Sequence, residues 1–104
     1  MKYTVIPASL ALAMASGASL AADAQQLLKD KACLSCHQLD KKVVGPAYKD
    51  VAAKYKARKD AEAYLVSKIK GGSTGVWGPI PMPPNGTVND AEAHTLAKFI
   101  LTVK

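Results

Sequence analysis

The residues most able to carry chemistry are Cys33-Leu34-Ser35-Cys36-His37, a C-x-x-C-H motif. Two thiols with this spacing on a helical turn can reach both vinyl groups of one haem and form thioether bonds. The histidine that follows then lies under the iron. The motif therefore predicts one covalently bound haem held by Cys33 and Cys36, with His37 as an axial iron ligand.

Three other kinds of site use the same residue types. A thioredoxin-like redox pair also contains C-x-x-C, but it lies beside a βαβ pattern that this sequence lacks. A zinc site could combine the motif residues with His94, yet adjacent Cys36 and His37 would have to converge on one tetrahedral ion. A plain disulfide leaves the histidine without a role. On the motif alone these alternatives stay open, and haem is favoured.

The second axial ligand is predicted at Met82. Met1 and Met14 lie in an N-terminal segment with the features of an export signal, so Met82 is the only methionine of the remaining chain. It lies within Gly78-Pro79-Ile80-Pro81-Met82-Pro83-Pro84-Asn85, where prolines fix φ and keep the backbone extended. Methionine usually fills gaps in cores. A single methionine between prolines is better suited to place its thioether against a metal, and His/Met ligation raises the reduction potential of haem iron.

Residues 1–21 have the features of a cleaved secretory signal peptide. Lys2 supplies a positive start, Val5 to Ala22 carries no charge, and a Ser-Leu-Ala cleavage pattern ends at Ala21. An uncleaved membrane anchor is the alternative because the run is about long enough to span a bilayer. Its proline, glycine and many small residues favour cleavage instead. We expect cleavage after Ala21, one domain at 22–104, export to the periplasm and no stable membrane insertion afterwards.

Length and charge restrict the function further. The chain has 104 residues and a formal net charge of +6, which allows one domain with a basic surface. Such a surface could contact nucleic acid, an anionic membrane or an acidic protein. Predicted export argues against nucleic acid, and the lysines are spread along the chain rather than massed. Because so small a domain is marginally stable alone, we expect a bound group to complete its core.

Hydrophobic periodicity predicts an all-α domain of four to five short helices. Apolar residues recur at helical spacing in four segments, and nothing resembles a strand long enough to build a sheet. The expected helices cover about 24–31, a segment after Gly45-Pro46, Asp60 to Gly71, and about 90–103. The residues expected on their buried faces are Leu27, Leu28, Tyr48, Val51, Ala52, Tyr55, Ala61, Leu65, Ile69, Leu96, Phe99, Ile100 and Val103.

Capping signals mark two of these helices. Asp60 is a good N-cap residue for the third helix, and Asn89 with Glu92 forms a capping-box pattern at the start of the last. The segment 71–88 between them is rich in glycine and proline, and a loop of this length usually has a function. On the last helix His94 falls away from the apolar stripe, so we expect it to face solvent rather than iron.

The sequence after residue 21 resembles the class I cytochromes c of the small bacterial cytochrome c-551 type, also called cytochrome c8. The resemblance covers this part of the chain almost end to end, and its third stretch is highly specific. The stretches that carry it are Lys31 to His37, Val44 to Ala52, Gly75 to Asn85, and Thr95 to Lys98. It implies a cytochrome c fold, with the helices wrapped around one covalent haem c.

The resemblance also implies roles for residues around the haem. The Pro46 carbonyl would accept a hydrogen bond from the outer nitrogen of His37, which orients an axial imidazole. Trp77 would donate its indole N–H to a haem propionate, and Asn85 would hydrogen-bond the Met82 sulfur. Each residue also has an ordinary structural explanation, as a turn, a core side chain and a loop side chain respectively.

Two features depart from the family pattern. Lys68 stands where the family often has arginine, and lysine cannot make the planar two-pronged contact with a propionate. Pairing at that position is therefore expected to be weaker or to pass through water. The segment 85–89 is one residue longer than the family pattern, which leaves the start of the last helix open.

The resemblance implies a soluble, monomeric one-electron carrier rather than an enzyme. It would move between a membrane cytochrome complex and a terminal acceptor such as the haem nitrite reductase, an oxidase or a peroxidase. Redox partners would dock at the exposed haem edge over a small interface, and nearby lysines would speed encounter with acidic partners. A haem enzyme or gas sensor is the alternative, and it would require Met82 to leave the iron.

Overall fold

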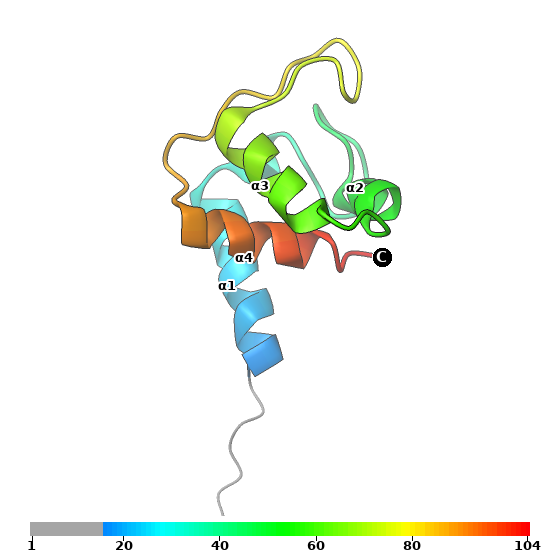
Figure 1. Cartoon of the computed structure of the whole chain (residues 1–104). Helices are drawn as coiled ribbons and strands as arrows, with labels where there is room; N and C mark the ends of the chain where they lie inside the picture. The colour runs from blue at the N-terminus through cyan, green and yellow to red at the C-terminus, as the bar shows by residue number, and fades with distance from the viewer. Residues whose placement is uncertain (1–15) are drawn as a thin grey trace, which may run out of the picture.

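Four α-helices form most of the regular structure in the computed structural model, which describes residues 16–104 (Figure 1). Within this range the only β pairing is two isolated bridges, so the all-α prediction is confirmed. The helices are α1 (Ser16–Asp30), α2 (Tyr48–Tyr55), α3 (Ala61–Gly71) and α4 (Asp90–Ile100), and a 3-10 turn, η1 (Cys33–Ser35), follows α1.

Helix α1 begins earlier than the start expected near residue 24. The segment from Ser16 to Ala22 has no proline, and its alanines and leucine are good helix formers, so the helix continues through the expected cleavage point after Ala21. Residues 1–15 of the predicted signal peptide lie outside the part of the chain that the structure describes. Among residues 16–104, no helix has both the length and the apolar character that crossing a bilayer requires.

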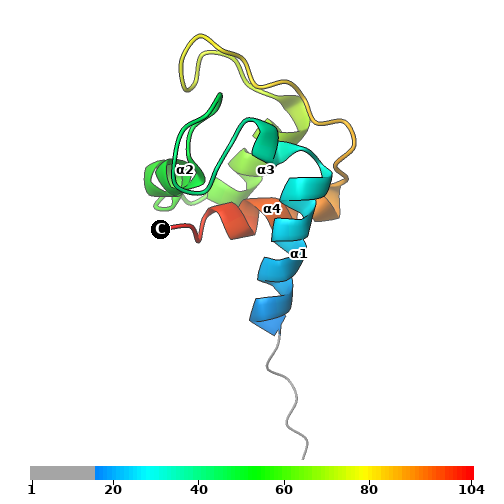
Figure 2. The same ribbon diagram turned by 180° about the vertical axis from the view of Figure 1, so that it is seen from behind.

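The core forms where α4 packs against α1 and α3. Figure 2 shows α1 and α4 crossing from behind, with α3 above them. The predicted stripes on α2 and α3 are all buried, and Leu28 and Leu96 are almost completely so. The stripe on α4 is buried at Leu96 and Ile100, whereas Phe99 is half-buried. Helical periodicity therefore identified most of the core correctly.

The two predicted caps have different outcomes. Asn89 accepts a hydrogen bond from the Glu92 backbone at 2.8 Å while the Glu92 carboxylate accepts from the Asn89 backbone at 3.0 Å, which confirms the capping box. Helix α4 accordingly begins at Asp90. Asp60 occupies the N-cap position of α3 but makes no capping bond, so that prediction is wrong. Its carboxylate pairs instead with the Arg58 guanidinium, because a charge-assisted contact is stronger than a bond to one backbone amide.

Two loops rise above the helices and leave space between them. One connects η1 to α2, and the other, from Gly72 to Asn89, arches over α3 (Figure 1, yellow to orange). The long loop is fastened near its base, where Ser73 and Met82 exchange backbone hydrogen bonds of 3.0 and 2.9 Å. The Asn85 amide also donates to the Ile69 carbonyl of α3 at 3.0 Å. These bonds give the proline-rich segment a defined position over the domain.

Candidate haem-binding site

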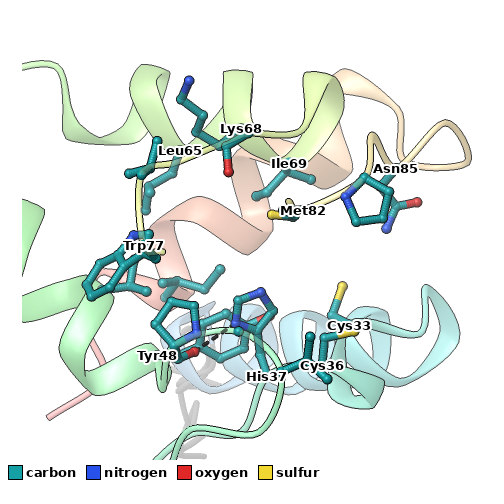
Figure 3. Close-up of a pocket in the computed structure, with 18 of the residues that line it drawn as sticks. Cys33, Cys36, His37, Tyr48, Leu65, Lys68, Ile69, Trp77, Met82 and Asn85 are labelled. Carbon is teal, nitrogen blue, oxygen red and sulfur yellow. Dashed lines mark hydrogen bonds between the residues drawn. The ribbon is translucent and has the colours of Figure 1, made fainter. Parts of the chain in front are cut away.

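A cavity of about 330 Å³ lies between the two loops and the helices. Its volume is within the ordinary range for small-molecule and cofactor sites, and its lining is mostly apolar. Figure 3 shows His37 on one side of this space and Met82 on the other. The residues predicted to bind the cofactor all line it: Cys33, Cys36, His37, Pro46, Lys68, Trp77, Met82 and Asn85.

The two cysteines reach the cavity from η1. Ala32 adopts a left-handed conformation (φ 61°), which ends the run of α1 and turns the chain into the motif. The Cys36 and His37 amides then both donate to the Cys33 carbonyl, at 3.2 and 3.0 Å. This tight turn brings the side chains of Cys33 and Cys36 to one wall, where both are free thiols. Burial raises the pKa of Cys33, so its sulfur is held as a thiol.

The His37 imidazole is held from two directions. Its Nδ1 lies 2.8 Å from the Pro46 carbonyl oxygen, the contact that the family resemblance implies. The Tyr48 ring stacks on the imidazole with centroids 4.7 Å apart and planes 17° from parallel. Burial lowers the pKa of His37, which favours the neutral ring. With an N–H on Nδ1 donated to Pro46, Nε2 keeps its lone pair and can bind a metal.

Gly45 allows the loop to approach this imidazole. A Cβ placed on Gly45 would lie 2.6 Å from His37 Cε1 and 3.0 Å from both ring nitrogens. No ordinary side chain fits there unless the imidazole moves. Gly45 therefore leaves room for the His37 imidazole, and the carbonyl of the next residue, Pro46, accepts its hydrogen bond.

Met82 faces the cavity from the opposite wall, and its side chain is partly buried (Figure 3). Its carbonyl is held by Ser73, and Gly72 packs directly beneath that backbone. The thioether is thus presented by a segment that prolines stiffen and hydrogen bonds anchor. A neutral sulfur on one wall and a neutral imidazole on the other suit the two axial positions of a haem iron.

Aromatic and basic residues gather at the end of the cavity where Trp77 lies (Figure 3). The Lys54 ammonium lies 4.6 Å from the centre of the Trp77 ring. The Lys68 ammonium lies 5.2 Å from the centre of the Tyr64 ring, and Figure 3 shows it directed away from the space between His37 and Met82. This end of the site is therefore suited to negatively charged groups.

A match to a family model described as cytochrome c, over residues 21–104, agrees with this geometry. The chain belongs to the cytochrome c family. It is 57% identical over 97 residues to cytochrome c-552 of Nitrosomonas europaea, which covers 93% of this chain and 91% of that protein. It is 53% identical over 103 residues to cytochrome c-551 of Pseudomonas aeruginosa, covering 94% and 98%. The crystal structure of wild-type Nitrosomonas europaea cytochrome c552 superposes with a TM-score of 0.75 at 60% identity, covering 77% of this chain and 99% of that one.

The cytochrome is an electron-transfer protein, its fold is that of the class I cytochromes c, and its cofactor is haem c. The site fits that group. It supplies two free thiols on one turn, an imidazole whose outer nitrogen is already held, and a thioether on the facing wall. It also contains a buried hydroxyl, that of Tyr55, with no hydrogen-bond partner.

Asn85, a predicted site residue, has other contacts in this cytochrome, and so does His94, which was expected to lie outside the site. The Asn85 side-chain amide donates to the Lys31 carbonyl at 3.3 Å, and its oxygen accepts from the Thr87 hydroxyl at 3.1 Å. Asn85 thus ties the long loop to the turn before the cysteines. His94 lies outside the cavity on α4, is about half exposed (48%) and contacts Glu62, so the prediction that it faces solvent is confirmed.

Sequence reasoning assigned Tyr48, Tyr55 and Tyr64 no role at the site. It placed the first two only on the buried stripe of α2, yet all three line the cavity. One signal was available, because two of these three tyrosines, Tyr48 and Tyr55, fall on the apolar face that periodicity predicts for α2. A phenol buried there needs a partner for its hydroxyl, and a core made only of hydrocarbon offers none.

Proposed function

We propose that Cys33 and Cys36 bind haem c through thioethers and that His37 and Met82 are its axial ligands. The observation that carries this proposal is that all four side chains line one cavity, with the imidazole and the methionine sulfur on opposite walls. Haem c supplies a reversible one-electron couple at its iron. Trp77 and Lys68 also line the cavity, and we propose that Trp77 contacts a propionate directly and Lys68 more weakly or through water. Asn85 is proposed to hydrogen-bond the Met82 sulfur.

The chain's own residues then set the properties of that couple. Pro46 and Tyr48 hold the imidazole of His37 in one orientation, and Gly72 and Ser73 hold the Met82 segment. Because His37 and Met82 are both held in place, they would ligate the iron in either oxidation state, and little rearrangement would accompany electron transfer. A neutral thioether favours the ferrous form and raises the potential.

The cytochrome is proposed to act in the periplasm as a soluble, monomeric shuttle between a membrane cytochrome complex and a terminal acceptor. The haem nitrite reductase, an oxidase and a peroxidase are candidate acceptors. Export would follow from a signal peptide at 1–21, leaving a mature domain of 22–104. The family match that starts at residue 21 supports this division. Lys42 lines the cavity, and basic residues there would attract acidic partners to the haem edge.

The visible spectrum of the purified protein tests the ligand set. Reversible ferric and ferrous haem c spectra and a methionine–iron charge-transfer band in the ferric form are expected. Met82→Ala should abolish this band and lower the reduction potential. Thr74→Ala, which changes an exposed side chain of the same loop outside the cavity lining, should leave both unchanged. A charge-transfer band that persists in Met82→Ala would contradict Met82 ligation. So would ready carbon monoxide binding by the unaltered ferrous protein.

Export and docking need separate measurements. Expression of the whole chain with haem-maturation machinery should give a periplasmic protein whose mass corresponds to a start at Ala22. A membrane-bound protein of full length would refute cleavage. Electron-transfer rates with an acidic partner should fall as ionic strength rises. Lys42→Glu should slow them more than Lys98→Glu, a matched charge reversal on α4 outside the cavity lining. Equal effects of the two variants would count against docking at the cavity mouth.

A further inference from the structure

The Tyr55 hydroxyl has no hydrogen-bond partner although it is buried. Tyr55 lies at the end of α2 with 6% of its surface exposed, and it lines the cavity. Among the residues that the structure describes, its hydroxyl is the only buried side-chain nitrogen or oxygen atom without a partner. Burying a hydroxyl without a partner costs free energy, so such atoms in folded proteins usually meet a ligand or ordered water.

Neighbouring side chains do not satisfy this hydroxyl. The Tyr55 ring packs against Tyr64 with centroids 4.9 Å apart, and it meets the Trp77 ring edge-on at 6.2 Å. Both neighbours influence the pKa of Tyr55, but neither meets its oxygen with hydrogen-bond geometry. Burial raises the pKa of Tyr55, so the phenol keeps its proton and is available as a donor.

The charges around this hydroxyl favour an acceptor that is an anion. Lys54 lies 5.6 Å from the Tyr55 ring centre and 4.6 Å from that of Trp77. Arg58 and Lys68 lie 4.0 and 5.2 Å from the centre of the Tyr64 ring, which packs on Tyr55. Arg58 is already paired with Asp60, which leaves the two lysines. A phenol, an indole and two ammonium groups supply donors and positive charge, and none of them supplies a carboxylate.

We propose that Tyr55 binds the cofactor directly, its hydroxyl donating a hydrogen bond to a carboxylate of haem c at the end of the cavity lined by Trp77. This inference rests on the proposed function, which places haem in the cavity. It adds Tyr55 to the propionate contacts expected of Trp77 and Lys68. The tyrosine supplies a fixed, buried donor where a lysine supplies only a mobile charge.

The hydrogen bond has a measurable consequence for the haem carboxylate. A donor to the ionised form lowers the pKa of the carboxyl group that accepts it. An ionised carboxylate near the iron favours the ferric state, so the reduction potential falls as pH rises through that pKa. Tyr55 therefore helps to set the pH at which the potential of the cytochrome begins to depend on pH.

The test is a pH titration of the haem propionate NMR signals, with the pH dependence of the reduction potential, in holoprotein carrying Tyr55→Phe. This variant removes one oxygen and keeps the ring. One propionate pKa should rise by about half a unit to one unit, as expected for one lost hydrogen bond to a charged acceptor. Thr95→Val is the control, since it removes a hydroxyl that lies on α4 outside the cavity lining and donates to the Ala91 carbonyl, and it should leave that pKa unchanged. Identical titrations in the unaltered protein and Tyr55→Phe would overturn the proposal.

A second measurement covers the case in which Tyr55→Phe does not accumulate. In the unaltered holoprotein, the Tyr55 hydroxyl proton should show a nuclear Overhauser contact to a propionate methylene. A hydroxyl in contact only with water would overturn the proposal. The methionine–iron band distinguishes failure of this proposal from failure of the proposed axial ligands. If the band is present but the titrations are unchanged, only the Tyr55 contact is refuted. Absence of the band in the unaltered protein refutes the ligation of Met82 instead.

Discussion

Gly72→Ala should loosen the segment that presents Met82. Gly72 ends α3 with φ 78° and ψ −177°, a backbone conformation that is open almost only to glycine. A Cβ there would lie 2.5 Å from the Met82 carbonyl oxygen and 2.9 Å from the Pro84 nitrogen. Both are backbone atoms, so they cannot rotate aside as the end of a side chain could. Either Gly72 must change its conformation or the whole methionine segment must move.

The expected cost follows from these two conflicts. Holding a non-glycine residue in this region costs about 1–3 kcal/mol, and overpacking adds about 1–3 kcal/mol. Because moving the segment relieves part of both, we expect the free energy of unfolding to fall by about 2–4 kcal/mol. The same movement breaks the backbone pair between Ser73 and Met82, so the thioether should leave its position in a fraction of molecules.

Guanidinium unfolding of the ferric holoprotein, followed together with the methionine–iron band, measures both effects. Gly71→Ala is the control, because a Cβ on this adjacent residue meets nothing within 4 Å. Its change in unfolding free energy should stay within about 0.5 kcal/mol. If Gly72→Ala unfolds at the same denaturant concentration as Gly71→Ala and keeps a full band, the steric reasoning is refuted.

Three further perturbations test other parts of the structure. Gly45→Ala should displace the His37 imidazole, and it should lower haem incorporation or alter the ferric spectrum, whereas an unchanged spectrum would contradict the close approach. Asn89→Ala should lower the free energy of unfolding by about 1 kcal/mol through the lost cap of α4, which corresponds to a fall in melting temperature of about 4–8 °C. A melting temperature within about 1 °C of the unaltered protein would contradict this. The Lys70 ammonium holds the pKa of Asp90 below its ordinary value. The pair therefore stabilises the fold at pH values above the pKa that Asp90 has in the unfolded chain. This stabilisation is lost as the pH falls through the lower pKa that Asp90 has in the folded protein. Lys70→Met should raise the Asp90 pKa in an NMR titration and move acid unfolding to higher pH, and an unshifted Asp90 would show that the contact is absent in solution.

Local patterns in the sequence predicted the four helices, apart from the early start of α1, and they are the basis for the four proposed haem-binding side chains. Helical periodicity located the stripes on α2 and α3 because the 3.6-residue repeat is a property of the backbone itself. The capping box at Asn89 was predictable for the same reason, since both its hydrogen bonds span three residues. The spacing of Cys33 and Cys36 reflects the dimensions of the cofactor, and Met82 stood out as the only methionine after residue 21.

Contacts between distant segments were decided only in three dimensions. Asn85 reaches Lys31, Tyr48 stacks on His37, and the hydroxyl of Tyr55 is left without a partner in the cavity. A local competitor also decided one cap, because Arg58, two residues before Asp60, pairs with the carboxylate that was expected to cap α3. A periodic pattern states which face of a helix is buried but not which atom lies opposite it. The partner of a buried polar group depends on how the helices cross, and that is set by the packing of the whole domain.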